Sequence, residues 1–126
     1  MYEVGVARSF HAAHQLEESP SAGDHHEHDY RVEAIVRGAV LEANGMLLDL
    51  DALGAAVDEC LDELESVELE SLETFEHENT TVENVAEHIW NHVRNLIDPP
   101  PQLASMRMTV HESGDAWASV DRPLQD

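Results

Sequence analysis

The sequence predicts an α+β fold in which two helices cover one face of a sheet. Apolar residues alternate with polar ones near both ends of the chain, which is typical of half-buried strands. In the middle of the chain they recur every three or four positions, which is typical of amphipathic helices. The resulting order is β-β-α-α-β-β, and this grouping of strands and helices indicates the α+β class. With 126 residues we expect a single domain, residues 1–126, built around one core.

The first two strands are expected over residues 2–10 and 30–37. Apolar positions of the first strand include Val4, Val6 and Phe10. One side of the second strand carries four alternate apolar residues: Tyr30, Val32, Ala34 and Val36. Each segment therefore has one apolar face, as expected of strands that pack against helices.

The first helix is expected to begin at Asp51, whose carboxylate can cap the first turn. Four residues form its apolar face: Leu53, Val57, Leu61 and Leu64. Cys60 adjoins this face, so we interpret it as a small buried core residue rather than a reactive thiol. The acidic stretch 65–78 has weak periodicity and is expected to connect the two helices.

The second helix is expected to begin at a capping box formed by Thr80 and Glu83. Five residues form its apolar stripe: Val82, Val85, Ile89, Val93 and Ile97. The prolines at 99–101 then end the helix. His88 and His92 are four residues apart, a spacing that can bind metal. Since no H-E-x-x-H motif is present, we expect both to be surface histidines.

Two further strands are expected near the end of the chain, over residues 106–112 and 116–121. Three apolar residues alternate in the first of them: Met106, Met108 and Val110. The sequence Ser113-Gly114-Asp115 between the strands predicts a hairpin turn. No internal repeat or low-complexity linker interrupts this order.

The charge balance is strongly acidic, with 27 acidic and 6 basic residues and a formal net charge of −21. Such a surface repels the phosphates of nucleic acids, so direct binding to nucleic acid is not expected. The acidity runs through every segment, which suits a protein that is folded and soluble at high salt, where carboxylate repulsion is screened. We therefore infer a salt-loving source.

Cysteine usage and hydropathy point to the cytoplasm. Cys60 is the single cysteine, which excludes a disulfide within the chain and suits a reducing compartment. The sequence has no apolar run of membrane-spanning length and no signal-peptide pattern at its start. We expect a cytoplasmic protein without a membrane partner.

Three histidines lie within four positions in the run S-A-G-D-H-H-E-H-D-Y, at the leading end of the second predicted strand. His26 and His28 share one face of a strand, whereas His25 points away. A third imidazole could come from His11 or His14, and their odd spacing means that only one of them is expected to bind. Three imidazoles without a thiolate favour zinc with one open position, with iron, nickel or copper as alternatives. The other interpretation is a histidine-rich surface loop that tolerates stray metal.

Glu112 is a second candidate functional residue. It ends a predicted strand just before a tight turn, where a carboxylate can face a pocket. A carboxylate that accepts two N–H donors suits the amino-pyrimidinone edge of a guanine-like ring. The alternative is a solvent-facing glutamate at a strand end.

Five segments, in order along nearly the whole chain, resemble motifs of the 6-pyruvoyl tetrahydropterin synthase and 6-carboxytetrahydropterin synthase family. The first two read F-H-A-A-H-Q-L, similar to F-x-A-A-H-x-L, and H-E-H, similar to the family's H-G-H zinc pair. The third reads G-M-L-L-D-L-D-A-L, similar to a G-M segment that ends in leucine. The last two read E-N-T-T-V-E-N-V-A-E-H-I-W and V-H-E-S, similar to E-N-P-T-x-E-N-x-A-x-x-I-W and V-x-E-T.

The resemblance implies a tunnelling fold (T-fold), with a four-stranded antiparallel sheet and two helices, assembled as a trimer or hexamer with active sites between subunits. It implies His14, His26 and His28 as ligands of Zn²⁺. It implies Glu112 as the anchor of the pterin ring, with Thr81 lining the pterin pocket. The family's substrate is 7,8-dihydroneopterin triphosphate, whose side-chain hydroxyls are acidified by zinc.

The chain departs from the family at the catalytic base. The usual cysteine lies four to six residues before the H-G-H motif, where this chain has Pro20, Ser21 and Ala22. One branch has a glutamate three residues before the motif, where this chain has Gly23. The family's L-D-H relay is also missing, and His77 is the nearest replacement. We predict Glu112 and His77 as catalytic residues, with Asp24 as another candidate base.

Three functions are consistent with these residues. The first is a lyase of the 6-carboxytetrahydropterin type, which would supply 7-deazaguanine modification of tRNA; folate-type and 6-pyruvoyl tetrahydropterin activities compete with it. The second is an enzyme or binding protein for another pterin-like or purine-like ligand. The third is a non-catalytic module that kept the zinc site.

Overall fold

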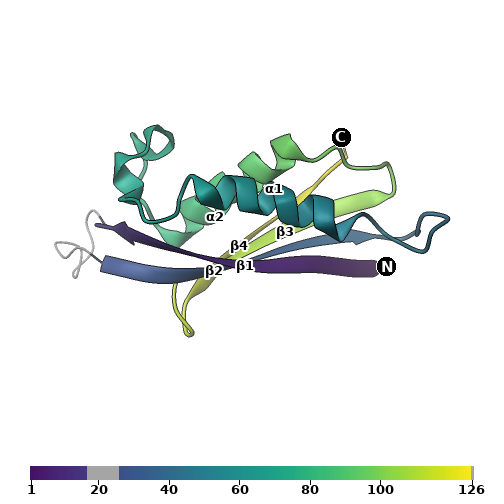
Figure 1. The fold of residues 1–126 in the computed structure, drawn as a ribbon, viewed down its shortest axis with the longest axis horizontal. Helices are drawn as coiled ribbons and strands as arrows, with labels where there is room; N and C mark the ends of the chain where they lie inside the picture. The colour runs from purple at the N-terminus through teal and green to yellow at the C-terminus, as the bar shows by residue number, and fades with distance from the viewer. Residues whose placement is uncertain (17–25, 126) are drawn as a thin grey trace.

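The computed structural model describes residues 1–16 and 26–125. Its main elements are β1 (Tyr2–His14), β2 (His26–Gly38), α1 (Leu50–Asp62), α2 (Val82–Leu96), β3 (Leu103–His111) and β4 (Trp117–Pro123). The strands form one antiparallel sheet in the order β1-β2-β3-β4. Figure 1 shows both helices on the same face of this sheet. The predicted α+β class and element order are confirmed.

The first two strands pair along their whole length of thirteen residues each. Phe10 lies opposite Tyr30, and His14 lies opposite His26 at the end of the ladder. The apolar alternation predicted that the first strand ends at residue 10, but the strand continues to His14. Backbone pairing continues through a segment whose side chains no longer alternate in polarity. β2 carries His26 and His28 at its start, as predicted.

The core lies between the sheet and the two helices. Residues that are fully buried in it include Val32 of β2, Leu53 of α1, Ile89 of α2 and Met108 of β3. Cys60 of α1 is also fully buried, and burial raises the pKa of its thiol to about 12. The interpretation of Cys60 as a core residue is confirmed.

Both helices begin at caps that differ from the predicted ones. The N-cap of α1 is Asp49, whose carboxylate accepts a hydrogen bond from the backbone N–H of Asp51 at 2.9 Å. The N-cap of α2 is Thr81, whose Oγ1 accepts from the N–H of Asn84 at 3.2 Å. Thr80, the predicted cap, is instead buried beneath the start of the helix. Within the described residues, neither helix is long and apolar enough to cross a membrane.

The acidic connection between the helices is an ordered segment that contains two short 3₁₀ helices, Leu69–Ser71 and Glu73–Phe75. Leu69 and Phe75 are buried and attach this segment to the core. Near its start, the carbonyl of Val67 accepts a hydrogen bond from the N–H of Ala13 at 3.0 Å. The connection therefore lies against the end of β1, close to His14.

Candidate functional site

Three imidazoles converge where β1 ends and β2 begins. We name His14, His26 and His28 the strand-end cluster. Their ring centroids are 4.9 Å apart for His14 and His28, 6.2 Å for His14 and His26, and 6.1 Å for His26 and His28. His11 lies elsewhere, since its ring nitrogens contact Asp29 at 2.8 Å and Glu27 at 3.2 Å. Of the two candidates for the third imidazole, His14 therefore lies with His26 and His28, and His11 does not.

The ring of His14 is oriented by a backbone group. His14 is 1% exposed, and its Nδ1 lies 2.8 Å from the carbonyl oxygen of Thr80. A carbonyl can only accept, so Nδ1 carries the proton and Nε2 carries the lone pair. A histidine that binds a metal through one ring nitrogen typically donates a hydrogen bond from the other nitrogen to a carbonyl or carboxylate oxygen.

Two members of the strand-end cluster, His14 and His28, have donor atoms spaced to fit a zinc ion, whereas the group of donor atoms within 4.8 Å of one another is completed by Glu112 and not by His26. The Nε2 atoms of His14 and His28 are 3.1 Å apart. Two nitrogens at about 2.0–2.1 Å from a tetrahedral zinc would be separated by about 3.3 Å, close to this distance. Burial lowers the pKa of His28, and the opposing effect of the Glu112 charge is smaller. The His28 imidazole is therefore held in the neutral form that binds metal.

Glu112 is brought to the same place from the end of β3, the other neighbour of β2 in the sheet. It follows the last residue of β3, and its backbone N–H donates to the carbonyl of Ala116 at 3.0 Å in the hairpin turn. One donor atom each of Glu112, His14 and His28 lies within 4.8 Å of the others. The half-buried carboxylate therefore faces the strand-end cluster, where it can bind a ligand's N–H groups or a metal.

Tyr30 is a neighbour of this site that the sequence did not single out. Its ring stacks on Phe10 with centroids 4.7 Å apart and meets His28 edge-on at 5.4 Å. Its hydroxyl is buried without a hydrogen-bond partner among the described residues. Burial, and then the charge of Glu112, raises the pKa of Tyr30, so the phenol is neutral. His26, His28 and Tyr30 are each two residues apart and therefore share one face of the strand. This spacing could have predicted that Tyr30 lies beside the strand-end cluster.

The remaining predicted site residues are Thr81, His77 and positions outside the described residues. Thr81 is the half-buried N-cap of α2, one position after the residue that holds His14. His77 is exposed in the turn that follows the second 3₁₀ helix. The positions that replace the family's cysteine or glutamate, and the candidate base Asp24, lie within residues 17–25, outside the described part of the chain.

His88 and His92 are not the surface histidines that the sequence predicted. Both are half-buried on the side of α2 that faces Cys60, and one donor atom from each of the three residues lies within 4.8 Å of the others. The connection between the helices contributes to the burial of His88, because Phe75 packs its ring 5.3 Å from that of His88. We name Cys60, His88 and His92 the helix cluster.

The sequence of this chain is similar to those of known tetrahydropterin synthases. Residues 3–123 match the family model described as 6-pyruvoyl tetrahydropterin synthase. A putative 6-carboxy-5,6,7,8-tetrahydropterin synthase of Archaeoglobus fulgidus is 29% identical over 94% of this chain and 95% of its own. A 6-pyruvoyl tetrahydrobiopterin synthase of Drosophila melanogaster is 31% identical over 70% of this chain and 52% of its own.

The fold of this chain is also similar to the folds of solved structures of such synthases. The structure of 6-pyruvoyl tetrahydropterin synthase from Caenorhabditis elegans has a TM-score of 0.85 at 23% identity, covering 96% of this chain and 95% of its own. The Plasmodium falciparum enzyme has a TM-score of 0.81 at 18% identity, covering 97% and 98%. The fold is therefore the T-fold of these synthases, and the chain belongs to the 6-pyruvoyl tetrahydropterin synthase family.

Proposed function

We propose that this protein is a zinc-dependent lyase that acts on the side chain of 7,8-dihydroneopterin triphosphate, as a 6-carboxytetrahydropterin synthase does. The observation that carries the proposal is the convergence of the strand-end cluster with Glu112. Similarity to the Archaeoglobus fulgidus protein over nearly the full length of both chains supports this branch of the family. Its product would supply 7-deazaguanine modification of tRNA.

The side chains of the site divide into metal ligands and ring-binding groups. The imidazoles of His14, His26 and His28 would hold the ion, with Nε2 of His14 freed by the bond to Thr80. A bound zinc ion acidifies the side-chain hydroxyls of the substrate. The Glu112 carboxylate would accept two N–H donors from the edge of the pterin ring, a charge-assisted pair that fixes its orientation. Thr81 would line the ring pocket.

Proton transfer needs a base in place of the family's cysteine, and we propose His77 for it. A general base contributes roughly 10²–10⁴-fold to a rate, so positioning by the other residues would leave measurable turnover even without a base. His77 is exposed in the described chain. This exposure suits a site that is completed by a second copy of the chain, and we propose a trimer or hexamer with the site between subunits.

A non-catalytic pterin-binding or purine-binding module is the second candidate. It is favoured by one observation, that Pro20, Ser21 and Ala22 stand where the family has its cysteine and Gly23 where one branch has a glutamate. Such a module would keep the strand-end cluster and Glu112 but would release its ligand unchanged.

Incubation of the zinc-loaded protein with 7,8-dihydroneopterin triphosphate tests both candidates. A 6-carboxy product supports the proposal, whereas 6-hydroxymethyl or 6-pyruvoyl products assign the protein to another branch. Tight binding without turnover selects the non-catalytic module. His77→Gln should lower kcat by roughly 10²-fold or more while ligand affinity is kept, if His77 is the base.

A further inference from the structure

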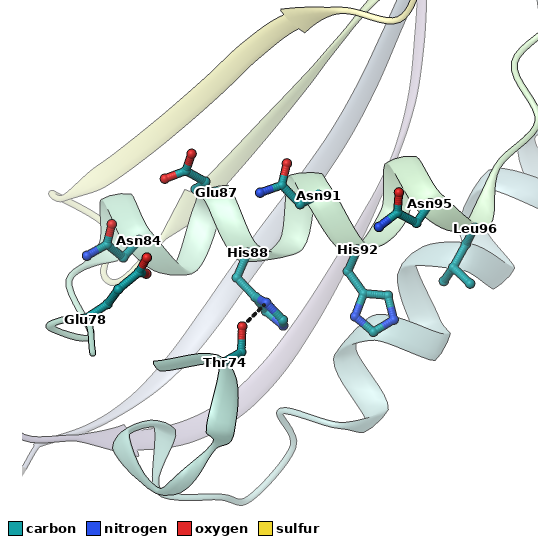
Figure 2. A pocket seen from close by; sticks show the side chains of 9 residues that line it. All are labelled: Thr74, Glu78, Asn84, Glu87, His88, Asn91, His92, Asn95 and Leu96. Carbon is teal, nitrogen blue, oxygen red and sulfur yellow. Dashed lines mark hydrogen bonds between the residues drawn. The ribbon is translucent and has the colours of Figure 1, made fainter. Parts of the chain in front are cut away.

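The helix cluster joins the two helices through side chains that bind transition metals. Cys60 comes from α1, and His88 and His92 come from successive turns of α2. One donor atom of each lies within 4.8 Å of the other two, and the rings of His88 and His92 are perpendicular with centroids 5.7 Å apart. Figure 2 shows both imidazoles projecting from the same side of α2.

Oxygen atoms lie beside the Nδ1 atoms of both rings. Nδ1 of His88 is 3.1 Å from Oγ1 of Thr74, and Nδ1 of His92 is 3.6 Å from Oε2 of Glu63. When Nδ1 carries the proton toward such an oxygen, Nε2 is left with the lone pair that binds a metal. Histidine ligands of zinc are oriented by hydroxyl, carbonyl or carboxylate oxygens in the same way.

We propose that Cys60, His88 and His92 form a second metal site, which takes zinc or another first-row divalent ion that prefers thiolate and imidazole. One thiolate and two imidazoles form a known zinc ligand set, with a fourth position for water or a carboxylate. Glu63 is the C-cap of α1, three residues after Cys60, and its Oε2 lies 3.6 Å from Nδ1 of His92. The site is separate from the strand-end cluster in both its residues and its elements, so it does not depend on the proposed function.

The imidazole side of this site borders pockets open to solvent, whereas Cys60 is fully buried. His88 and His92 line a pocket of about 500 Å³ that runs along α2, and Figure 2 shows Thr74 facing His88 across it. A second pocket of about 450 Å³ shares Thr74 and His88 with the first and is also lined by Glu63. Carboxylates among the lining residues of both pockets make the approach favourable for a cation.

Packing alone explains Cys60 as a buried core residue and His88 as a half-buried one, but not why the donor atoms of all three residues lie together. The ring of His88 meets Phe75 and its Nδ1 meets Thr74, which is sufficient for a half-buried core histidine. It does not require a buried thiol and a second imidazole with donor atoms within 4.8 Å of a His88 ring nitrogen. A bound ion would tie α1 to α2 and stabilise the folded chain by mass action, since the unfolded chain does not hold the three donors together.

Cobalt and zinc titrations of the metal-free protein test the proposal. We expect two ions per chain and, with Co²⁺, a thiolate-to-metal charge-transfer band that the all-imidazole strand-end cluster cannot give. Cys60→Ser should remove the band, and His92→Ala should weaken the second ion at least about tenfold. His26→Ala should keep the band.

Controls and contrary outcomes are defined by the same titration. Asn95→Ala is the matched control, because Asn95 is exposed on α2 and lines the same pocket without belonging to the cluster. It should bind both ions like the unaltered chain. One ion per chain without the band would overturn the proposal, as would a band that survives in both Cys60→Ser and His92→Ala. His92→Ala keeps the test valid if Cys60→Ser does not fold, since the His92 side chain is 22% exposed whereas Cys60 is fully buried.

Discussion

Nδ1 of His14 donates a hydrogen bond of 2.8 Å to the backbone carbonyl of Thr80, a residue sixty-six positions later in the chain. This bond joins the end of β1 to the residue just before the N-cap of α2. It directs the unprotonated Nε2 of His14 at His28. The geometry of the strand-end cluster thus depends on how the start of α2 docks on the sheet.

Removal of His28 should abolish metal binding at the strand-end cluster. His28→Ala takes away a neutral imidazole whose Nε2 is 3.1 Å from that of His14, and two imidazoles do not replace three. Equilibrium dialysis against zinc should show one ion fewer per chain. His11→Ala is the control, because His11 bonds to Asp29 and Glu27 instead. Equal metal content in His28→Ala and the unaltered chain would refute the ligand assignment.

Glu112→Gln should weaken binding of 7,8-dihydroneopterin and leave the metal in place. The substitution keeps the size of the side chain but replaces a charged acceptor by an amide. Loss of one charged hydrogen bond costs about 1.5–3 kcal/mol, so affinity should fall at least about tenfold. Calorimetry of ligand binding and metal analysis are the two measurements. If zinc is lost as well, Glu112 is a metal ligand, which its position near His14 and His28 would explain.

The neighbouring threonines at the start of α2 should respond in opposite ways to substitution. Thr81→Ala removes the cap to Asn84 and should lower the free energy of unfolding by about 1 kcal/mol. Thr80→Val should be neutral or stabilising, because Thr80 Oγ1 is buried without a partner among the described residues. Urea unfolding at one fixed salt concentration measures both. Equal losses would show that the cap is wrongly assigned.

Folding should require salt. A net charge of −21 on 126 residues places many carboxylates within a Debye length of one another, and their repulsion falls as that length shrinks from about 10 Å at 0.1 M to 3 Å at 1 M. Circular dichroism should show secondary structure increasing from low to molar salt. Two salts at equal ionic strength separate screening from ion binding. A fully folded chain without added salt would contradict the halophilic interpretation.

Periodicity was sufficient to predict the sheet and both helices, because it follows directly from which side chains face the core. The convergence of His26 and His28 was predictable for the same reason, since residues two apart share one face of a strand. The caps were each misplaced by one or two residues. Two capping residues stand close together at each helix start, and the choice depends on tertiary contacts such as the one that occupies the Thr80 carbonyl.

The helix cluster could not be predicted from the stripe of α2 alone. The pattern of Val85, Ile89 and Val93 marks the face that meets the core, but it does not show what covers the adjacent face. The adjacent face is covered by the acidic connection between the helices. Its many acidic residues gave no indication that Leu69 and Phe75 within it are buried. A histidine that seems solvated on an isolated helix is therefore half-buried in the folded chain.

The position of β1 at the border of the sheet has a consequence for how copies of this chain meet. β1 and β4 are the outer strands, and the connection between the helices bonds to β1 at His11 and Ala13. Outer strands carry unpaired backbone groups that can form a ladder with another chain, and like charge on two chains opposes that approach. The salt that screens repulsion within one molecule also screens it between molecules. Folding and edge-to-edge association should therefore be promoted by the same ionic conditions.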